Sequence, residues 1–346
     1  MLCVHTVKPE LILTHEAIIR QFENLPGPDV EAGAAVEAHE KNLTKPAGAL
    51  GKLEELCVWC ATWQARYPPS LDNTTILIFA GNHGVAKHGV SAFPSAVTAQ
   101  MVRNFRTGGA AINQLAAVQD AKIEVVELDL EEPTADFTIE PAMSEPDFLK
   151  AFTQGFNAVE PSWNLLILGE MGIGNTTSAA ALSSALFGGD PADWTGPGTG
   201  LNSRDIARKA MIIRAGLERH ATSIVDPLSA LQCLGGRELA AVAGAILAAR
   251  RCRIPVFLDG FVTTAAAAVL EKVSPGALDH CVLGHVSFEP GHKKLLTALN
   301  KTPLLDLGMR LGEASGAAVA LGILRCAIAA HTGMATFEEA AISRKV

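Results

Sequence analysis

The sequence predicts an α/β fold in which a doubly wound, mostly parallel sheet has helices on both faces. From residue 75 onward, short aliphatic runs bounded by glycine alternate with longer Ala-rich stretches, a pattern typical of parallel strands covered by helices. The 346 residues are 49% hydrophobic and 18% charged, which is enough to bury a large core. No Ser/Pro-rich or charged linker divides the middle, so we expect one large domain with appended elements.

Each aliphatic run predicts a strand, and each longer Ala-rich stretch predicts a helix. The expected strands span residues 75–80, 123–128, 164–169, 254–259 and 281–284. The expected helices span residues 94–105, 110–118, 176–187, 204–220, 239–249, 262–272 and 314–330. Ligands of such open sheets bind beyond the carboxyl ends of the strands, so the residues just after each strand are the candidates for chemistry.

The chain ends and one internal segment depart from this alternation. Residues 1–45 contain helical stretches with no strand before them, and residues 322–346 also read as helical. We expect both termini to form a small helical domain beside a large α/β domain of residues 46–321. Residues 131–147 are acidic and contain proline, which is typical of a surface loop.

Charge and hydropathy exclude several classes of partner. The formal net charge is -8 and the basic residues are scattered, which argues against nucleic acid, although a small anion can be held locally. The first 13 residues lack a basic region, a long apolar run and a cleavage site, and no later segment supplies about 20 uninterrupted apolar residues. We expect a soluble, cytoplasmic protein with no membrane contact.

The cysteines are best explained by packing. Seven of them, widely spread in a long chain, argue against a disulfide framework. Cys57 and Cys60 form a C-x-x-C pair inside an apolar helical pattern, with no second pair to complete a zinc site. We expect this pair to lie in the core rather than to bind a metal, and we expect no metal site.

Residues 168–177 run from a buried strand through a glycine turn into an Ala-rich helix, which is typical of an anion site. Gly172 lets the backbone approach a phosphate, Asn175 or Thr176 can cap the helix, and free N–H groups can face the ligand. Glu170, at the end of the strand, can face a cationic ribose. The spacing matches neither an ATP-type P-loop nor a dinucleotide fingerprint, and a plain strand–helix connection is the alternative.

A second glycine turn, residues 195–203, precedes a helix that carries Arg204, Arg208, Lys209 and Arg214. Alternating glycines, Gly196, Gly198 and Gly200, before a basic helix indicate a further phosphate or ribose contact. A flexible loop followed by a solvated helix face is the alternative, but two such turns in one sheet favour anion binding.

Hydroxyl, imidazole and carboxylate groups follow the last expected strand in residues 284–293. His285 and His292 are seven residues apart, which does not match the i, i+4 spacing of a helical zinc pair. Ser287 is the better candidate for a substrate hydrogen bond, and turn chemistry is the alternative.

In residues 309–318 a single acid, Glu313, lies among small and apolar residues at the start of a helix. Desolvation raises the pKa of such a carboxyl and makes it a better proton acceptor, whereas Arg310 lowers that pKa or binds a phosphate instead. An acid placed at a helix N-terminus by the macrodipole is the alternative. Earlier in the chain, His83 follows a strand, and a structural histidine is favoured over a catalytic one.

Together, residues 43–54, 82–85, 169–177, 258–261 and 309–316 resemble the nicotinate-nucleotide:dimethylbenzimidazole phosphoribosyltransferase family of cobalamin biosynthesis. The resemblance runs in the same order from about residue 43 to the C-terminus. The family implies a homodimer with a doubly wound large domain and a small helical domain built from both chain ends. It also implies a reaction in which nicotinate mononucleotide and 5,6-dimethylbenzimidazole give α-ribazole 5′-phosphate and nicotinate, with no cofactor.

The resemblance assigns roles by motif position. Glu313 matches the proton acceptor, and we expect Glu170 as the second catalytic carboxylate. The phosphoribosyl side is expected at Gly172, Asn175, Thr176, Gly198, Gly200, Lys209, Asp259, Ser287 and Arg310. The acceptor base is expected near Phe93, Pro94, Met309 and Leu311. Asn82 and the strand end at residues 128–130, around Asp129, depart from the family pattern, which leaves the preferred base open.

Two rival functions use the same residues differently. A nucleotide-binding sensor has the same turns but no turnover. A metal hydrolase would use His83, His88 and Asp259.

Overall fold

A six-stranded, all-parallel sheet forms the centre of the protein in the computed structural model, which describes residues 12–198 and 200–343. The strand order is β2-β1-β3-β4-β5-β6, so the order reverses between β1 and β3. The strands are β1 (Thr74–Ala80), β2 (Lys122–Glu127), β3 (Leu165–Met171), β4 (Val256–Leu258), β5 (Cys281–His285) and β6 (Pro303–Leu305). The prediction of an α/β parallel fold is confirmed.

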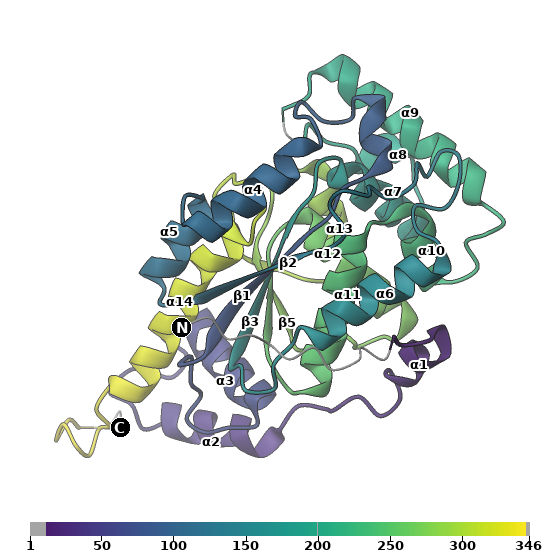
Figure 1. Ribbon diagram of the computed structural model, residues 1–346. Helices are drawn as coiled ribbons and strands as arrows, with labels where there is room; N and C mark the ends of the chain where they lie inside the picture. Colours follow the sequence, from purple (N-terminus) through teal and green to yellow (C-terminus); the bar gives the residue numbers. More distant parts are fainter. Residues whose placement is uncertain (1–11, 199, 344–346) are drawn as a thin grey trace.

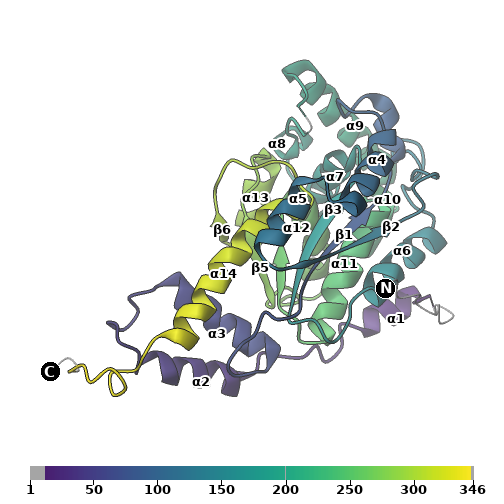
Figure 2. The same ribbon diagram turned by 60° about the vertical axis from the view of Figure 1, so that its left-hand side comes forward.

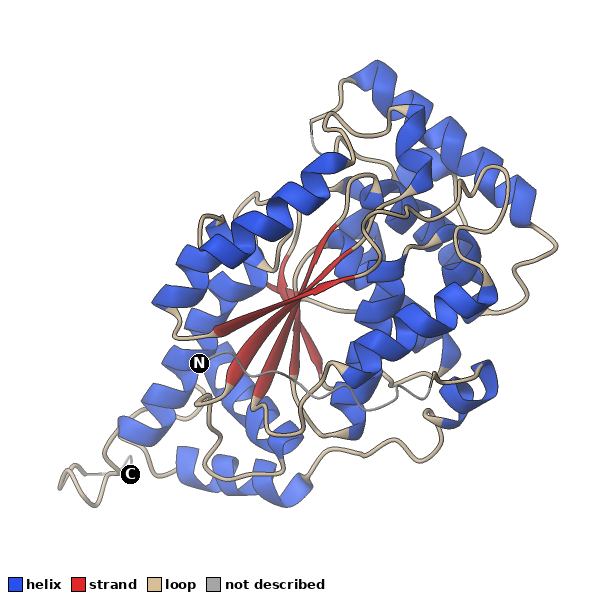
Figure 3. Cartoon of the chain, in the orientation of Figure 1, coloured by secondary structure: helices blue, strands red, loops and turns tan. Residues whose placement is uncertain are grey.

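Helices cover both faces of the sheet (Figures 1 and 3). One face is covered by α3 (Lys52–Gln64), α4 (Ala96–Thr107), α5 (Ala111–Val118) and α14 (Ser315–Gly333). The other face carries α6 (Glu145–Asn157), α7 (Asn175–Phe187), α10 (Pro227–Leu234), α11 (Arg237–Arg251) and α12 (Phe261–Val273). The 3-10 helix η1 (Gly84–His88), α8 (Pro191–Trp194), α9 (Ser203–His220) and α13 (Pro290–Ala298) lie around the carboxyl ends of the strands.

The burial of the strands explains why they read as continuous aliphatic runs. All seven residues of β1 are buried, because helices cover both of its faces. The edge strand β2 instead alternates exposed and half-buried residues. The five expected strands and seven expected helices are confirmed, with no end moved by more than three residues.

The two chain ends meet beyond the sheet. Figure 2 shows α2 (Val30–Glu40) and α3 beside the C-terminal half of α14. An antiparallel bridge joins Leu43 to Thr336, and Glu40 Oε1 lies 2.6 Å from Nδ1 of His331. By contrast, α1 (His15–Arg20) lies apart from this group, beside α6 and α11, and Ile18 joins the main core there. The division at residues 45 and 322 stays a prediction.

Two expectations for local structure are wrong. Residues 131–147 are not simply a surface loop, because Phe137 and Met143 are buried in the main core and α6 begins at Glu145. The C-terminal segment is not helical throughout, since α14 ends at Gly333 and turns follow it. The short elements β6, α8, α10 and α13, together with the longer helix α6, were not expected.

The longest apolar helix belongs to the core. By length and composition alone α14 is apolar enough to cross a membrane. Leu321 and Leu324 are fully buried there, and the helix packs on β5, β3 and α3. Cys57 and Cys60 of α3 are also buried in apolar clusters, which confirms that this pair packs in the core. Burial raises the pKa of the Cys57 thiol to about 12, so it stays protonated.

Candidate active site

A cavity of about 370 Å³ opens at the carboxyl ends of the strands, where residues following β3, β4 and β5 converge. This is the edge at which ligands bind in doubly wound sheets. The lining residues are Phe93, Val97, Met101, Glu170, Met171, Gly172, Ile173, Asn175, Thr176, Gly198, Gly260, Phe261, Val262, His285, Ser287, Glu289, Arg310, Leu311, Gly312 and Glu313. The structure therefore brings together segments that are distant in the sequence.

Glu313 projects from a strained turn just before α14. Gly312, Glu313 and Ala314 all adopt left-handed backbone conformations, with φ of 85°, 63° and 69°. Such φ values are uncommon outside glycine and concentrate at functional sites. The turn lies directly on β3, because a Cβ atom on Gly169 would approach Ala314 N to 2.7 Å. Glu313 thus precedes the helix instead of sitting in its first turn, and backbone N–H groups at the start of α14 bond to Asp259 rather than to Glu313.

The Glu313 carboxyl is suited to accept a proton. Its side chain is buried, and Oε2 has no hydrogen-bond partner among the described residues. Burial, together with the charge of Asp259, raises the pKa of Glu313 to about 7. A carboxylate of that pKa can both receive and release a proton near neutral pH.

Glu170 is the second buried carboxyl of the cavity. Burial raises the pKa of Glu170 to about 8, and the charges of Glu238, Asp259 and Glu313 add to the effect. Asn175 Nδ2 donates a hydrogen bond to Glu170 Oε2. The expectation that Asn175 or Thr176 caps α7 is wrong, because Gly174 takes the N-cap position. Asn175 instead orients Glu170.

Asp259, expected on the phosphoribosyl side, lies behind the cavity lining. Its Oδ1 accepts a hydrogen bond of 2.9 Å from Ala317 N and lies 3.5 Å from Nε2 of His285. Burial raises the pKa of Asp259 to about 7, although backbone donors from the start of α14 oppose the shift. Asp259 therefore fixes α14, and with it the position of Glu313.

A buried pair supports the first glycine turn from below. His83 bonds through Nε2 to Glu238 Oε1 and lies 3.1 Å through Nδ1 from Ser178 Oγ. A Cβ atom on Gly172 would lie 2.8 Å from Glu238 Oε1, so only glycine fits over this pair. His83 is a structural histidine, as the sequence favoured.

The second glycine turn faces the first across the cavity. Lys209 of α9 is fully buried and donates a hydrogen bond of 2.7 Å from Nζ to Thr176 Oγ1. Gly198 lies over this pair, since its Cβ position is 3.0 Å from Thr176 Oγ1. Arg310 Nη1 donates to the Gly198 carbonyl oxygen at 3.0 Å. Two cations, a hydroxyl and a glycine backbone thus meet at one point, as anion binding requires.

Two other basic residues of α9, Arg208 and Arg214, have other partners. Arg208 bonds to Gly89 O and to Asp205, and Arg214 pairs with Asp190. Of the expected turn, Gly200 has φ of 117° but does not line the cavity, and Thr199 lies outside the described residues.

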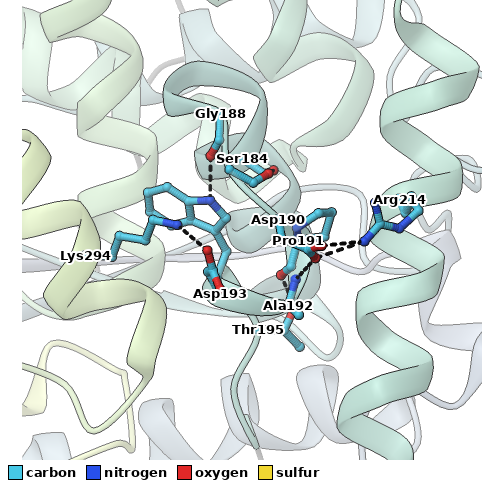
Figure 4. A network of polar contacts seen from close by, with 11 residues as sticks. Ser184, Gly188, Asp190, Pro191, Ala192, Asp193, Thr195, Arg214 and Lys294 are labelled. Atoms are coloured by element: carbon cyan, nitrogen blue, oxygen red, sulfur yellow. Dashed lines mark hydrogen bonds and ion pairs between the residues drawn. The ribbon is translucent and has the colours of Figure 1, made fainter.

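A polar network holds α8, which leads directly into the second turn (Figure 4). Arg214 Nη2 donates to both carboxylate oxygens of Asp190, each at 2.9 Å. Lys294 of α13 lies 2.9 Å from Asp193 Oδ2 and 4.6 Å above the Trp194 ring, whose Nε1 donates to Gly188 O. The network ties α8 to α9 and α13 and so fixes where the second turn begins.

Ser287 is placed for both of the roles that the sequence left open, a hydrogen bond to substrate and the stabilisation of its own turn. It lines the cavity, and it also stabilises its own turn, because its N–H donates to His292 Nδ1 and its Oγ accepts from Glu289 N. Burial lowers the pKa of His292 to about 3, so the ring accepts this hydrogen bond in its neutral form.

Of the four residues expected around the base, two line the cavity and two do not. Phe93 and Leu311 line the cavity and are 52% and 56% exposed, so they form an apolar rim that a flat ligand can cover. Pro94 and Met309 do not line the cavity. Apolar side chains from α4 and the start of α12, Val97, Met101, Phe261 and Val262, complete the wall and were not expected as site residues.

Glu289 is a further cavity residue that the sequence did not predict. It lies at the N-cap of α13 and is buried, and its Oε1 accepts a hydrogen bond of 2.8 Å from Gly198 N. The signal available was its place after β5 beside Ser287, but only the fold brings it against residue 198.

The three residues of the metal-hydrolase hypothesis do not form a group. His83 bonds to Glu238, His88 lies 2.8 Å from Asp136, and Asp259 bonds to Ala317 N. Within residues 12–198 and 200–343, no three His, Cys, Asp or Glu side chains are arranged to hold a metal ion.

Comparison with known proteins agrees with this geometry. A family described as phosphoribosyltransferase matches residues 25–342. Nicotinate-nucleotide–dimethylbenzimidazole phosphoribosyltransferase of Cereibacter sphaeroides is 55% identical over 93% of this chain and 95% of its own length. The enzyme of that name from Allorhizobium ampelinum is 53% identical over 93% and 94%. The crystal structure of CobT from Thermus thermophilus is similar with a TM-score of 0.84 and 40% identity, over 91% of this chain and all of that one.

Proposed function

The chain belongs to the nicotinate-nucleotide–dimethylbenzimidazole phosphoribosyltransferase family, and from this premise we propose that its cavity transfers a phosphoribosyl group to a planar base. The enzyme moves the 5-phosphoribosyl group of nicotinate mononucleotide to 5,6-dimethylbenzimidazole. The products are α-ribazole 5′-phosphate and nicotinate, and the reaction belongs to cobalamin biosynthesis.

One observation supports this chemistry above the others: the buried Oε2 of Glu313 has no partner among the described residues, and Glu313 lines the same cavity as the apolar residues Phe93 and Leu311. A ring nitrogen of the base attacks C1′ while the bond from C1′ to the pyridinium nitrogen breaks. Nicotinate leaves with the bonding electrons and becomes neutral at its ring nitrogen. The other ring nitrogen of the base then sheds its proton to Glu313.

The two glycine turns are assigned to the phosphate and ribose. Lys209 and Arg310 supply positive charge, and Thr176, Ser287 and the backbone at Gly172 and Gly198 supply hydrogen-bonding groups. Asn175 keeps Glu170 directed toward the sugar. Asp259 acts indirectly, by holding the start of α14.

Carboxylates facing the sugar stabilise the positive charge that develops on the ribose as the pyridinium departs. We place Glu170 in that role: burial raises its pKa to about 8, and the positive charge of the bound pyridinium nucleotide favours its ionised form. The base lies against Phe93 and Leu311, with Pro94 and Met309 outside the immediate lining. Attack on the face opposite the leaving group inverts the anomeric centre, which turns a β-nucleotide into an α-riboside.

A direct assay separates this function from a nucleotide sensor. Purified protein is incubated with nicotinate mononucleotide, with and without dimethylbenzimidazole, and nicotinate and α-ribazole phosphate are quantified by chromatography. We expect equal amounts of both products, formed only when the base is present. Binding of the nucleotide with no product would reject the transferase and support the sensor.

The proposal also includes a homodimer in the cytoplasm. Besides Phe93 and Leu311, the large apolar residues Phe288 and Leu307 near the cavity are 61% and 59% exposed, which is typical of a surface covered in an assembly. Light scattering of the purified protein measures its mass, and a monomer would contradict this part.

A further inference from the structure

We propose that Glu289 is a positioning residue, which anchors the glycine turn at Gly198 and serves as the counter-charge of Lys209 in the phosphate subsite. The inference rests on the proposed function, because it assigns a role inside the same cavity. Glu289 takes no part in the proposed proton transfer, and its negative charge would repel the substrate phosphate.

The first observation is a clamp on one glycine residue. Glu289 Oε1 accepts a hydrogen bond of 2.8 Å from Gly198 N, while Arg310 Nη1 donates one of 3.0 Å to Gly198 O. The turn is therefore held at residue 198 from the loop after β5 and from the loop before α14. Removal of the carboxylate would break one of these two contacts, the hydrogen bond from Gly198 N.

The second observation concerns close packing under the same turn. A Cβ atom on Gly196 would lie 2.2 Å from Glu289 Oε2, so the carboxylate fits directly beneath the turn backbone. Oε2 has no hydrogen-bond partner among the described residues, although Glu289 is only 4% exposed. A buried carboxylate without a full set of donors is costly unless a nearby positive charge compensates for it.

Glu289 and Lys209 lie at the same residue of the turn, because Gly198 N donates to Glu289 Oε1 and the Cβ position of Gly198 is 3.5 Å from Lys209 Nζ. Burial lowers the pKa of Lys209 to about 8, and the negative charge of Glu289 opposes that shift. The helices α7 and α10, which pack against α9, contain no charged residue. In α8, Asp193 pairs with Lys294, and Asp190 at its N-cap pairs with Arg214. Arg310 contacts the same turn but carries positive charge.

The consequence is a dependence of phosphate binding on pH. Lys209 is protonated below its pKa and can then bind the phosphate; above it the amine is neutral and binds poorly. Loss of the Glu289 charge lowers the pKa of Lys209 further, so phosphate binding weakens at a lower pH. Near pH 6.5 Lys209 keeps its proton in both forms of the enzyme.

Steady-state kinetics of the full-length enzyme test this at pH 6.5 and 8.5, with saturating dimethylbenzimidazole. For Glu289→Gln we expect the KM for nicotinate mononucleotide within about twofold of wild type at pH 6.5 and about 5–10-fold higher at pH 8.5, since one pKa unit changes the charged fraction up to tenfold. Nicotinate riboside, which lacks the phosphate, should show no such difference. Glu218→Gln removes an exposed carboxylate from the same helix as Lys209 and should leave both KM values unchanged.

Glu289→Asp separates the anchor from the charge. It keeps the carboxylate but withdraws it by one methylene, so KM should rise at both pH values with the wild-type pH dependence. This variant also serves if Glu289→Gln fails to fold, as judged by its melting temperature, and an unchanged KM in Glu289→Asp would overturn the anchoring role.

A Glu289→Gln profile parallel to wild type, or equal losses with the riboside, would overturn the counter-charge role. If wild-type enzyme releases no nicotinate, the proposed function fails, and this inference fails with it.

Discussion

Arg310 joins two loops that are 112 residues apart, because its Nη1 donates a hydrogen bond of 3.0 Å to the carbonyl oxygen of Gly198. Arg310 is separated by only two residues from Glu313. One side chain therefore connects the glycine turn at Gly198 to the segment that carries Glu313, the proposed proton acceptor.

Replacing Arg310 by Met should weaken donor binding. A charge-assisted hydrogen bond contributes about 1.5–3 kcal/mol, which corresponds to a KM for nicotinate mononucleotide roughly 10–100-fold higher. Arg310→Lys keeps the charge but loses the planar fork, so it should recover only part of the loss. Initial rates at varied donor concentration measure both, and an unchanged KM in Arg310→Met would contradict the phosphate assignment.

Glu313→Gln should abolish proton transfer without removing the side chain's shape. We expect kcat to fall by about 10²–10⁴-fold, the usual contribution of a general base. Because the proposed function places Glu313 beside the base and away from the phosphate, the KM for the donor should change little. Single-turnover formation of α-ribazole phosphate provides the measurement, and wild-type turnover in a folded Gln variant would exclude Glu313 as the acceptor.

The pH profile of kcat/KM should be narrow. Burial and Asp259 raise the pKa of Glu313 to about 7, so activity is lost below pH 7 as the acceptor becomes protonated. Burial lowers the pKa of Lys209 to about 8, so activity is lost above pH 8 as this cation becomes neutral. Nicotinate release between pH 5.5 and 9.5 tests the profile. A flat rate down to pH 5.5 would show that Glu313 does not limit the reaction.

The sequence predicted those parts of the site that follow strands in regular order. Glu170 and Ser287 come directly after buried aliphatic runs, and parallel strands bring their carboxyl ends to one edge. Glu313 stood out because a lone acid among small residues is unusual. Five strands and seven helices followed from the same alternation of short and long apolar stretches.

Other features depend on contacts that spacing does not encode. Glu289 accepts a hydrogen bond from Gly198, 91 residues earlier in the chain. Glu238 of α11 packs against Gly172, which lies in the turn between β3 and α7. Asn175 looked like a helix cap, but the nearby carboxyl of Glu170 competes for its side chain and Gly174 takes the cap. The buried part of residues 131–147 was hidden because proline and acidic residues outnumber Phe137 and Met143.

Gly169→Ala should damage the site through backbone displacement. The added Cβ would meet Ala314 N at 2.7 Å and Ala314 Cβ at 2.8 Å, so the Glu313 turn must move. Overpacking of this kind costs about 1–3 kcal/mol of unfolding free energy, and kcat should fall more than about tenfold. Gly27→Ala is the matched control, because nothing lies within 4 Å of its Cβ position. Equal kcat in the two variants would refute the packing argument.

Lys45→Met should destabilise the segment from α2 to α3, which pairs with the C-terminal end through Leu43 and Thr336. Lys45 Nζ lies 2.8 Å from Glu40 Oε2 and 2.7 Å from Glu54 Oε1, and its side chain is 6% exposed. Breaking a buried ion pair leaves an uncompensated charge, so we expect unfolding free energy to fall by about 2–4 kcal/mol in denaturant titrations. Lys52→Met, which breaks the exposed pair with Glu55, should cost less than about 0.5 kcal/mol.

Lys45→Met should also change how the free energy of unfolding depends on pH. Burial raises the pKa of Glu40, but hydrogen bonds from Lys45 and His331 outweigh burial and leave the pKa below its ordinary value of 4.5. A carboxyl with a lowered folded pKa stabilises the protein above its unfolded pKa, and this contribution is lost as pH falls through the folded value. Wild-type stability should therefore drop below about pH 4.5, and Lys45→Met should show a shallower drop. Identical slopes for the two proteins would mean that Lys45 does not hold Glu40 ionised.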